Sequence, residues 1–188
     1  MRRLLLMLLI MILGVSGVMG CAGLRPTEEA GKPKVTLERV EIVGAFPWAD
    51  LPARTPLVLG FVFNINNPSG YNIELENFKF AFSFEVVKDK YIELNIPVVY
   101  DRVYFPAKTV SQYRVVSLVD SAVITGKLMV TQGPLLMSLN LKPVDVIKNW
   151  YAKIGDFAFG IKVGEGQATF STEKGDVIVP FEGKFPKK

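Results

Sequence analysis

The 188-residue chain contains no histidine and a single cysteine, Cys21. The absence of histidine excludes Ser-His-Asp and Cys-His triads and the usual zinc sites, and a lone cysteine excludes an internal disulfide. The aspartates stand singly, without EF-hand spacing, although a carboxylate pair assembled by folding stays open. The Gly-Glu-Gly-Gln stretch at 164–167 lacks the flanking glycines and the lysine of a phosphate loop, so we interpret it as a plain turn. We therefore expect neither an enzyme nor a bound metal or cofactor.

The chain also lacks a strong excess of either charge. Its formal net charge is +4, and this falls to +2 when Arg2 and Arg3 are set aside. The basic residues are scattered, whereas a nucleic-acid interface needs a clustered stripe. At 49% hydrophobic and 11% aromatic residues, the chain is too apolar for a disordered protein. We expect a folded domain and no nucleic-acid partner.

The one long uncharged run lies at the N-terminus. Arg2 and Arg3 precede Leu4 to Gly20, which carries no charge and ends in small residues before Cys21. This layout is typical of an export signal. An uncleaved membrane anchor is an alternative, because a run of about 17 residues is at the short limit for crossing a bilayer of about 30 Å. A second alternative is that Cys21 stands after the apolar run by chance.

The residues Val18-Met19-Gly20-Cys21 resemble the lipobox of bacterial lipoproteins. The resemblance implies a signal peptide at 1–20, cleavage between Gly20 and Cys21, and fatty acyl chains of the palmitate kind on Cys21. Two or three acyl chains would hold the protein at a membrane almost permanently. Ala22 takes the place of the aspartate that signals inner-membrane retention in enteric-type bacteria. The expected location is the cell envelope, lipid-anchored, with the outer membrane facing the periplasm favoured over the inner membrane.

Residues 21–34 combine the cysteine with prolines, glycines and mixed charges, which indicates a flexible tether. At about 3.3 Å per residue, the tether reaches about 40 Å. Residues 35–188 are then one domain, long enough to bury about 70% of the surface of its unfolded chain.

Alternation of period two dominates this domain and predicts strands. In 57–66, residues Leu57, Leu59, Phe61, Phe63 and Ile65 share one face, and in 78–86 four phenylalanines do so: Phe78, Phe80, Phe82 and Phe84. The phenylalanines fit a sandwich core, with the lining of a lipid cavity as the alternative. Further strands are expected at 35–43, 91–99, 109–119, 156–163, 166–172 and 176–185, with turns at 164–166 and 174–176.

One helix is expected at 142–155, with Pro143 and Asp145 in its first turn and Lys153 near its end. Its apolar stripe comprises Val144, Ile147, Tyr151 and Ile154. The stretch 118–139 is apolar throughout and is interrupted by Gly126 and Gly133-Pro134. Helix, strand and a surface covered by a partner all remain open for it.

Many short strands and one or two helices predict a mainly β protein, an immunoglobulin- or fibronectin-III-like antiparallel β-sandwich. Trp48 lies in a proline-rich loop, where it either anchors a partner or caps the end of the sandwich. Asn67 precedes Pro68, which favours an extended backbone there, and Gly70 suits the turn that follows.

The stretch GFVFNINNPSGYNIELENFKF, with its Asn67-Pro68 turn, and the closing ATFSTEKGDVIVPFEGKF resemble the water-stress and hypersensitive-response (WHy) domain of the late-embryogenesis-abundant (LEA) type 2 family. The resemblance spans about residues 36–186, and Ser69 replaces a second asparagine that is common in the family. It implies a sandwich with a helix, an association with desiccation and other stress, and no catalytic residues. Related domains handle lipid at membranes.

Two functions follow as hypotheses. The first is a non-enzymatic envelope module that protects or holds partners under stress. The alternative is a lipid-binding or lipid-transfer component with acyl chains between its sheets. The expected partners are the membrane, through the acyl chains on Cys21, and envelope proteins or lipid. An accessory subunit covered over 118–139 is a third possibility.

Overall fold

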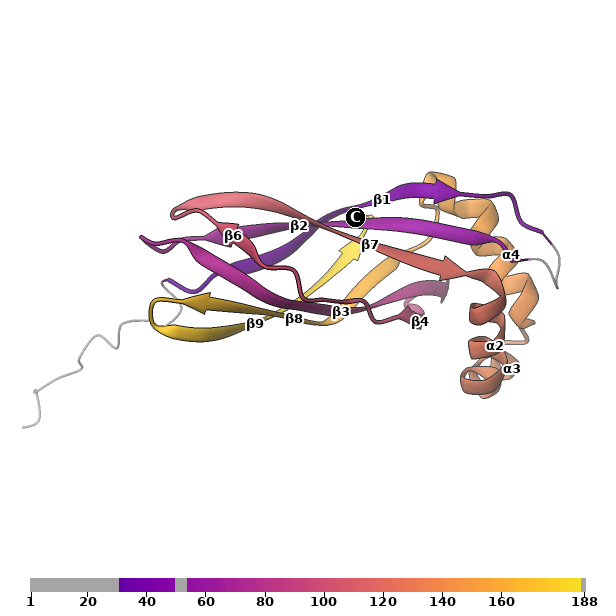
Figure 1. Ribbon diagram of the computed structural model, residues 1–188. Coiled ribbons are helices and arrows are strands. Elements are labelled where there is room, and N and C mark those ends of the chain that lie inside the picture. Colours follow the sequence, from indigo (N-terminus) through magenta and orange to yellow (C-terminus); the bar gives the residue numbers. More distant parts are fainter. Residues whose placement is uncertain (1–30, 50–53, 187–188) are drawn as a thin grey trace, which may run out of the picture. The chain divides into compact units, whose positions relative to one another are not determined.

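The computed structural model describes residues 31–49 and 54–186. The predicted signal peptide, the cleavage site at Gly20, the lipidation site at Cys21 and most of the tether therefore lie outside the described residues. The described part is a β-sandwich of two antiparallel sheets with helices at one end (Figure 1). The predicted fold class is confirmed, with three α-helices among the described residues in place of one or two.

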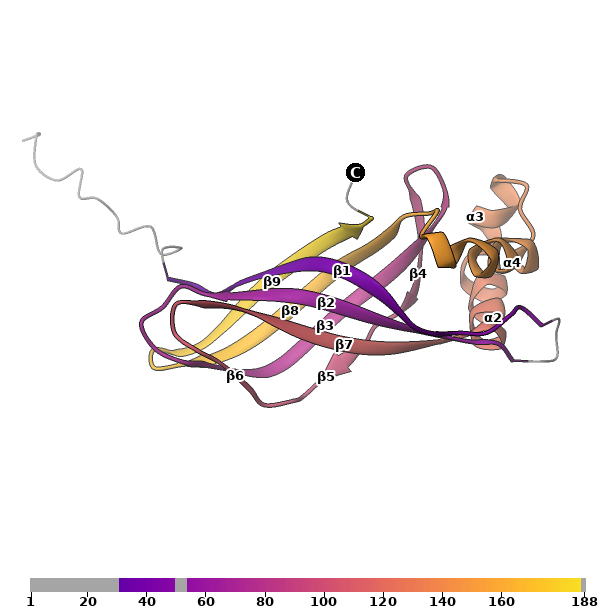
Figure 2. The same cartoon turned by 90° about the horizontal axis from the view of Figure 1, so that it is seen from above.

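The first sheet has three strands in the order β1-β2-β7 (Figure 2). They are β1 (Lys34–Ala45), β2 (Pro56–Asn67) and β7 (Thr109–Asp120). The register of β2 on β7 is unbroken from Pro56, opposite Asp120, to Asn67, opposite Thr109. The alternation in 57–66 therefore places five apolar side chains on one face, and all five are fully buried.

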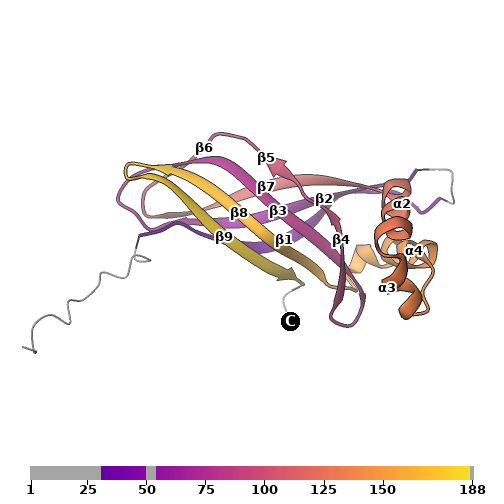
Figure 3. The same cartoon turned by 90° about the horizontal axis from the view of Figure 1, so that it is seen from below.

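The second sheet has the order β4-β3-β8-β9, and two short strands also pair with β3 (Figure 3). Its members are β3 (Ile73–Val87), β4 (Lys90–Asn95), β5 (Val98–Val99), β6 (Val103–Phe105), β8 (Ile161–Thr172) and β9 (Gly175–Phe185). The predicted turn at 174–176 is the β8–β9 connection, where Gly175 has a φ of 103° that favours glycine.

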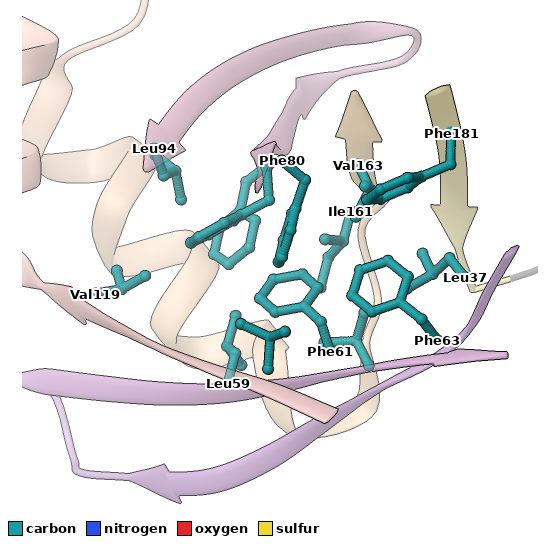
Figure 4. Packing of buried hydrophobic residues seen from close by; sticks show 14 of the residues in the cluster. Leu37, Leu59, Phe61, Phe63, Phe80, Leu94, Val119, Ile161, Val163 and Phe181 are labelled. Atoms are coloured by element: carbon teal, nitrogen blue, oxygen red, sulfur yellow. The ribbon is translucent and has the colours of Figure 1, made fainter. Parts of the chain in front are cut away.

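The core is an aromatic layer between the two sheets (Figure 4). The four phenylalanines of β3 are buried, as predicted. Three of them meet rings of β2 or β9, whereas Phe84 meets Trp150 and Phe159. Ring centroids are 4.9 Å apart for Phe63 and Phe78, and 5.1 Å apart for Phe61 and Phe80. Phe181 stacks on Phe78 at 4.8 Å. Each such pair contributes about 0.5–1.5 kcal/mol beyond simple burial.

The unassigned stretch 118–139 forms the end of β7 and two helices, α2 (Ser121–Thr131) and α3 (Gly133–Ser138). Asp120 caps α2, because its Oδ1 accepts hydrogen bonds from the backbone N–H groups of Ala122 and Val123 at 2.9 and 3.2 Å. Pro134 lies in the first turn of α3, where its missing N–H is harmless.

The predicted helix at 142–155 is confirmed as α4 (Pro143–Lys153), followed by the short 3-10 helix η1 (Ile154–Asp156). Its buried side chains are Val146, Ile147, Trp150 and Ile154. The predicted stripe is therefore rotated: Val144 and Tyr151 are only half-buried. Trp150 attaches this face of the helix to β3. Its ring meets Phe84 edge-on at 5.5 Å, and its Nε1–H donates to the carbonyl of Glu85 at 2.7 Å.

Two predictions near β8 are wrong. The strand expected at 156–163 starts only at Ile161, because η1 occupies its first residue and Phe157 adopts a left-handed φ of 49°. The turn expected at 164–166 is a bulge inside β8, with a register shift between Val163 and Gly166 against β9. Glu165 has φ 49° there, and a Cβ on Gly166 would overlap the carbonyl oxygen of Phe181.

The strand registers define two opposite ends of the sandwich. Lys34, the first residue of β1, pairs with Asn66, whereas Ala45 pairs with Leu57 beside the start of α2. The "turn end" thus holds Lys34 and the Asn67-Pro68 turn, and the "helical end" holds α2, α3 and α4 (Figures 1 and 2). Among residues 31–49 and 54–186, no helix has the length and apolar character to cross a membrane.

Candidate functional site

The Asn67-Pro68 turn is built around a buried, fully hydrogen-bonded asparagine. The Asn67 side chain has no exposed surface. Its Nδ2 lies 2.9 Å from the carbonyl oxygen of Tyr71, and 3.1 Å from those of Phe105 and Pro106. Its Oδ1 accepts from the backbone N–H of Ser69 at 3.1 Å and from the Ser69 hydroxyl at 2.7 Å. Asn67 therefore joins the β2–β3 turn to the segment between β6 and β7.

The geometry makes the Asn67 turn a structural site, as the sequence pattern indicated. Pro68 is exposed, and both ends of the Asn67 amide are occupied by partners from this chain. Ser69 occupies the position where the resembled family often has asparagine, and its hydroxyl supplies one of the contacts. The turn holds two connections of the sandwich together and presents no group to a ligand.

A hollow of about 700 Å³ lies beside the β3–β4 hairpin. Its lining includes Glu85, Tyr91, Lys184, Phe157 and Phe185. Glu85 holds two loops, because its Oε1 accepts from the backbone N–H of Asp89 at 2.9 Å and its Oε2 from that of Gly160 at 2.8 Å. The Lys184 Nζ lies 5.3 Å from the centre of the Tyr91 ring. The side chains of Glu85 and Lys184 are thus both engaged in structural contacts.

Trp48 packs against the helical end. Its ring meets that of Tyr151 edge-on at 5.5 Å, and the Lys148 Nζ lies 5.9 Å from its centre. The hydroxyl of Tyr151 donates in turn to the carbonyl of Thr55, just before β2. Trp48 is half-buried and contacts the core cluster. Of the two interpretations offered by the sequence, the structure supports capping of the sandwich end.

We expect the stability of the domain to fall as the pH rises above about 10. Burial, with a contribution from Asp101, raises the pKa of Tyr113 to about 12, and burial, with a contribution from Asp120, raises the pKa of Tyr151. An unfolded tyrosine loses its proton near pH 10. Above that pH the unfolded state releases protons that the folded state retains, so the free energy of unfolding decreases. Each unit of pKa difference corresponds to about 1.4 kcal/mol.

Urea titrations between pH 8 and pH 12 measure this dependence. The Tyr113→Phe variant removes one titrating group and should lose stability less steeply above pH 10. A free energy of unfolding that stays constant up to pH 12 would contradict the raised pKa values.

The helical end carries exposed apolar side chains. Val123 and Val130 of α2 are 62% and 82% exposed, and Met137 of α3 is 80% exposed. Between residues 121 and 141 the only charged side chain is Lys127, whose Nζ lies 3.1 Å from Glu93 Oε1. The sequence showed that this stretch was apolar, but it did not separate inner from outer residues. The signal that was available is Asp120, a helix-capping residue directly before the run.

Within the two described ranges, no group of three or more acidic, cysteine or histidine side chains is placed as metal ligands would be. The expectation of a non-enzymatic protein without cofactor stays a prediction.

No protein-family model and no curated protein matches the chain. Among solved structures, it is similar to the crystal structure of a protein from Archaeoglobus fulgidus, with 12% identity, a TM-score of 0.40, and coverage of 81% of this chain and 98% of the other. It is also similar to the solution structure of a protein from Arabidopsis thaliana, with 10% identity, a TM-score of 0.45, and coverage of 80% and 77%. Similarities this distant carry no inference about function.

Proposed function

We propose that the protein is a membrane-tethered, non-enzymatic envelope lipoprotein of the LEA type 2 and WHy kind, which acts as a protective or interaction module under desiccation and related stress. The lipobox at Cys21 supports a lipid anchor, and the Asn67-Pro68 turn supports a relationship to the LEA type 2 family. In this proposal the acyl chains hold the protein in the outer membrane on its periplasmic side. The domain then acts through its surface.

One observation favours a function at the surface over lipid binding inside the domain: side chains fill the space between the sheets. Phe61, Phe63, Phe80 and Phe82 have no exposed surface, and the Phe61 ring contacts both Phe80 and Phe82 at 5.1 and 4.8 Å. Acyl chains between the sheets would have to displace these rings. The packed interior therefore favours an interaction module over the lipid-transfer alternative.

The proposed tether is tested by the intact mass of the protein purified from membranes. We expect a chain that begins at Cys21 and carries two or three acyl chains. We also expect that deletion of the gene lowers the survival of the host after drying, and that the wild-type chain restores survival better than Cys21→Ser. An unmodified full-length mass would overturn the lipoprotein assignment. Unchanged survival of the deletion strain would overturn the protective role.

A further inference from the structure

The edge of the three-stranded sheet that is formed by β7 carries unpaired backbone groups (Figure 2). The N–H of Ser121 donates to the carbonyl of Thr55 at 3.2 Å, and this pair continues the unbroken register of β7 on β2. Because hydrogen-bonded pairs alternate with non-bonded pairs along an antiparallel ladder, the odd-numbered residues of β7 bond to β2. The even-numbered residues from Val110 to Leu118 direct their N–H and C=O groups to the free side, where the described residues form no hydrogen bond with them.

The other edges of the described sheets are protected against strand pairing, whereas β7 is not. β1, at the far edge of the same sheet, has two register shifts against β2. In the second sheet, β9 contains Pro180 and has a register shift against β8, and the opposite edge consists of β4, β5 and β6, with six, two and three residues. β7 has 12 residues, an unbroken register, and neither proline nor lysine. Such an edge is a template for another strand.

The surface beside this edge is apolar. Val116 and Leu118 point outward from β7 and are 49% and 56% exposed. Asn95, at the end of β4, donates a hydrogen bond to the Ser117 hydroxyl at 3.2 Å, which places the connection after β4 next to β7. Ile96, the next residue of this connection, is 40% exposed. A strand added to β7 would cover part of this surface, so pairing buries apolar side chains as well as backbone groups.

The sequence of β7 fits a second copy of the same strand. In an antiparallel pair with Ser117 opposite Ser117 of the second copy, Val116 faces Leu118. Arg114 then faces Asp120, and these two are the only charged residues of β7. No other register of this pairing joins the two charges. The strand is therefore complementary to itself in its apolar residues and in its charges.

The contacts of the two charged side chains are compatible with this register. Asp120 caps α2 through Oδ1, while its Oδ2 lies 3.8 Å from Nη1 of Arg54. Arg114 packs over Gly60 and donates from Nε to Glu41 at 3.0 Å. Its side chain is 48% exposed, so it can turn toward the free edge and reach Asp120 of the second copy. A charge pair at such an exposed site selects the register, and the backbone hydrogen bonds and apolar contacts supply the affinity.

We propose that β7 pairs with β7 of a second copy around a two-fold axis at Ser117. The two sheets then join into one continuous sheet of six strands, three from each copy. The even-numbered residues of β7 supply the backbone hydrogen bonds, and Val116 packs against Leu118 on the outer face. This inference goes beyond the proposed function and does not depend on the lipid anchor, because it rests on β7 and its surroundings alone.

The first test is the mass of the chain from residue 21, with Cys21→Ser, measured by sedimentation equilibrium over a dilution series that reaches millimolar concentrations. This chain contains the whole core, from Val35 to Phe181. We expect a reversible dimer. Val116→Pro should raise its dissociation constant at least about tenfold, because each copy loses one hydrogen bond across the joint. The N–H of Val116 does not bond to β2, so the domain itself should stay folded.

The matched variants are Val116→Lys and Val43→Lys. Val43 lies on β1, at the other edge of the same sheet, and is 47% exposed, against 49% for Val116. Only the lysine on β7 should weaken the dimer. A thermal melt of each variant establishes that it is folded. A dimer that folded Val116→Lys leaves unchanged would overturn the proposal. So would a monomer at every concentration, including one that captures an envelope protein through β7.

The register is tested by cysteines at the facing positions. Directly opposite Cα atoms of a hydrogen-bonded pair lie about 5.5 Å apart, within the range for a disulfide, whereas diagonal neighbours are about 7–8 Å apart. In the Cys21→Ser chain, a mixture of Val116→Cys and Leu118→Cys should form a covalent dimer with oxidised glutathione, and either variant alone should do so far less. Cross-linking of each variant to itself in preference to the other would overturn the register.

Discussion

Replacement of Phe82 by alanine is expected to lower the free energy of unfolding by about 3–5 kcal/mol, the usual loss for a large ring removed from a packed core. The Phe82 ring is fully buried, and its centroid lies 4.8 Å from that of Phe61 and 6.1 Å from that of Phe84. The neighbouring rings belong to the same strand or to the facing sheet, so they can close the vacated space only in part. Urea denaturation of the chain from residue 21 measures the loss.

Phe46→Ala is the matched control for Phe82, since it makes the same truncation at a ring that is 56% exposed. It should change the free energy of unfolding by no more than about 0.5 kcal/mol. Extraction of both variants with organic solvent then reports bound lipid. A loss below about 1 kcal/mol for Phe82→Ala, together with near-stoichiometric lipid in the parent chain, would contradict the packed interior and favour a lipid container.

The Asn67→Ala variant is expected to lose about 2–4 kcal/mol, because it removes the side-chain partner of two polar groups at about 1–3 kcal/mol each. The groups concerned are the carbonyl oxygen of Phe105 and the N–H of Ser69. The carbonyl oxygens of Tyr71 and Pro106 each have a second donor at 2.8 Å, the hydroxyl of Ser69 or of Thr109. Thermal or urea unfolding followed by circular dichroism measures the effect. The neighbouring Asn66 is exposed, and Asn66→Ala should fall within about 0.5 kcal/mol of the parent.

Asn67→Asp separates the donor function of the side chain from its size. Aspartate retains an oxygen at the position that accepts from Ser69, but it cannot donate to the three carbonyl oxygens and would place a carboxylate beside them. We expect it to destabilise the domain at least as much as alanine does. An aspartate variant as stable as the parent would contradict the role given to the Nδ2 hydrogen bonds.

Much of the sandwich could be predicted because its strands obey a strict local rule. In β2 from Leu57 to Ile65, and in β3 from Phe78 to Phe84, every second residue is a large apolar side chain that points into one core, and burial of these residues follows directly from the alternation. The Asn67-Pro68 turn was also visible, since proline and glycine restrict the backbone locally. These features depend on residues that are close in the sequence.

The helical end was less predictable because its residues are apolar on both sides. In α2, Val123 and Val130 are exposed while Ile124 and Leu128 are buried, so hydrophobicity has almost no preferred direction around the helix. The helix period is therefore absent from the pattern. The Asp120 cap was a local signal, but Gly126 and Gly133 in the same stretch argued against a continuous helix.

The bulge in β8 has the sequence pattern of a turn, because glycine serves both purposes. Gly164 and Gly166 flank Glu165, a pattern typical of a chain reversal. Here Gly166 is required by the close approach of the Phe181 backbone on β9, which is a contact between distant parts of the chain. The partners of Asn67 at Phe105 and Pro106 are likewise about 40 residues away. No local pattern could have identified either interaction.

The separation of Lys34 from the helices has a mechanical consequence. Tension applied between the tether and the helical end runs along β1 and β2, parallel to the strands. The hydrogen bonds between antiparallel strands are perpendicular to the strands, so the ten residue pairs of the β1–β2 register carry the load together instead of breaking one after another. The domain is therefore built to resist being stretched between its two ends, whereas a pull that peeled β1 sideways would open it pair by pair.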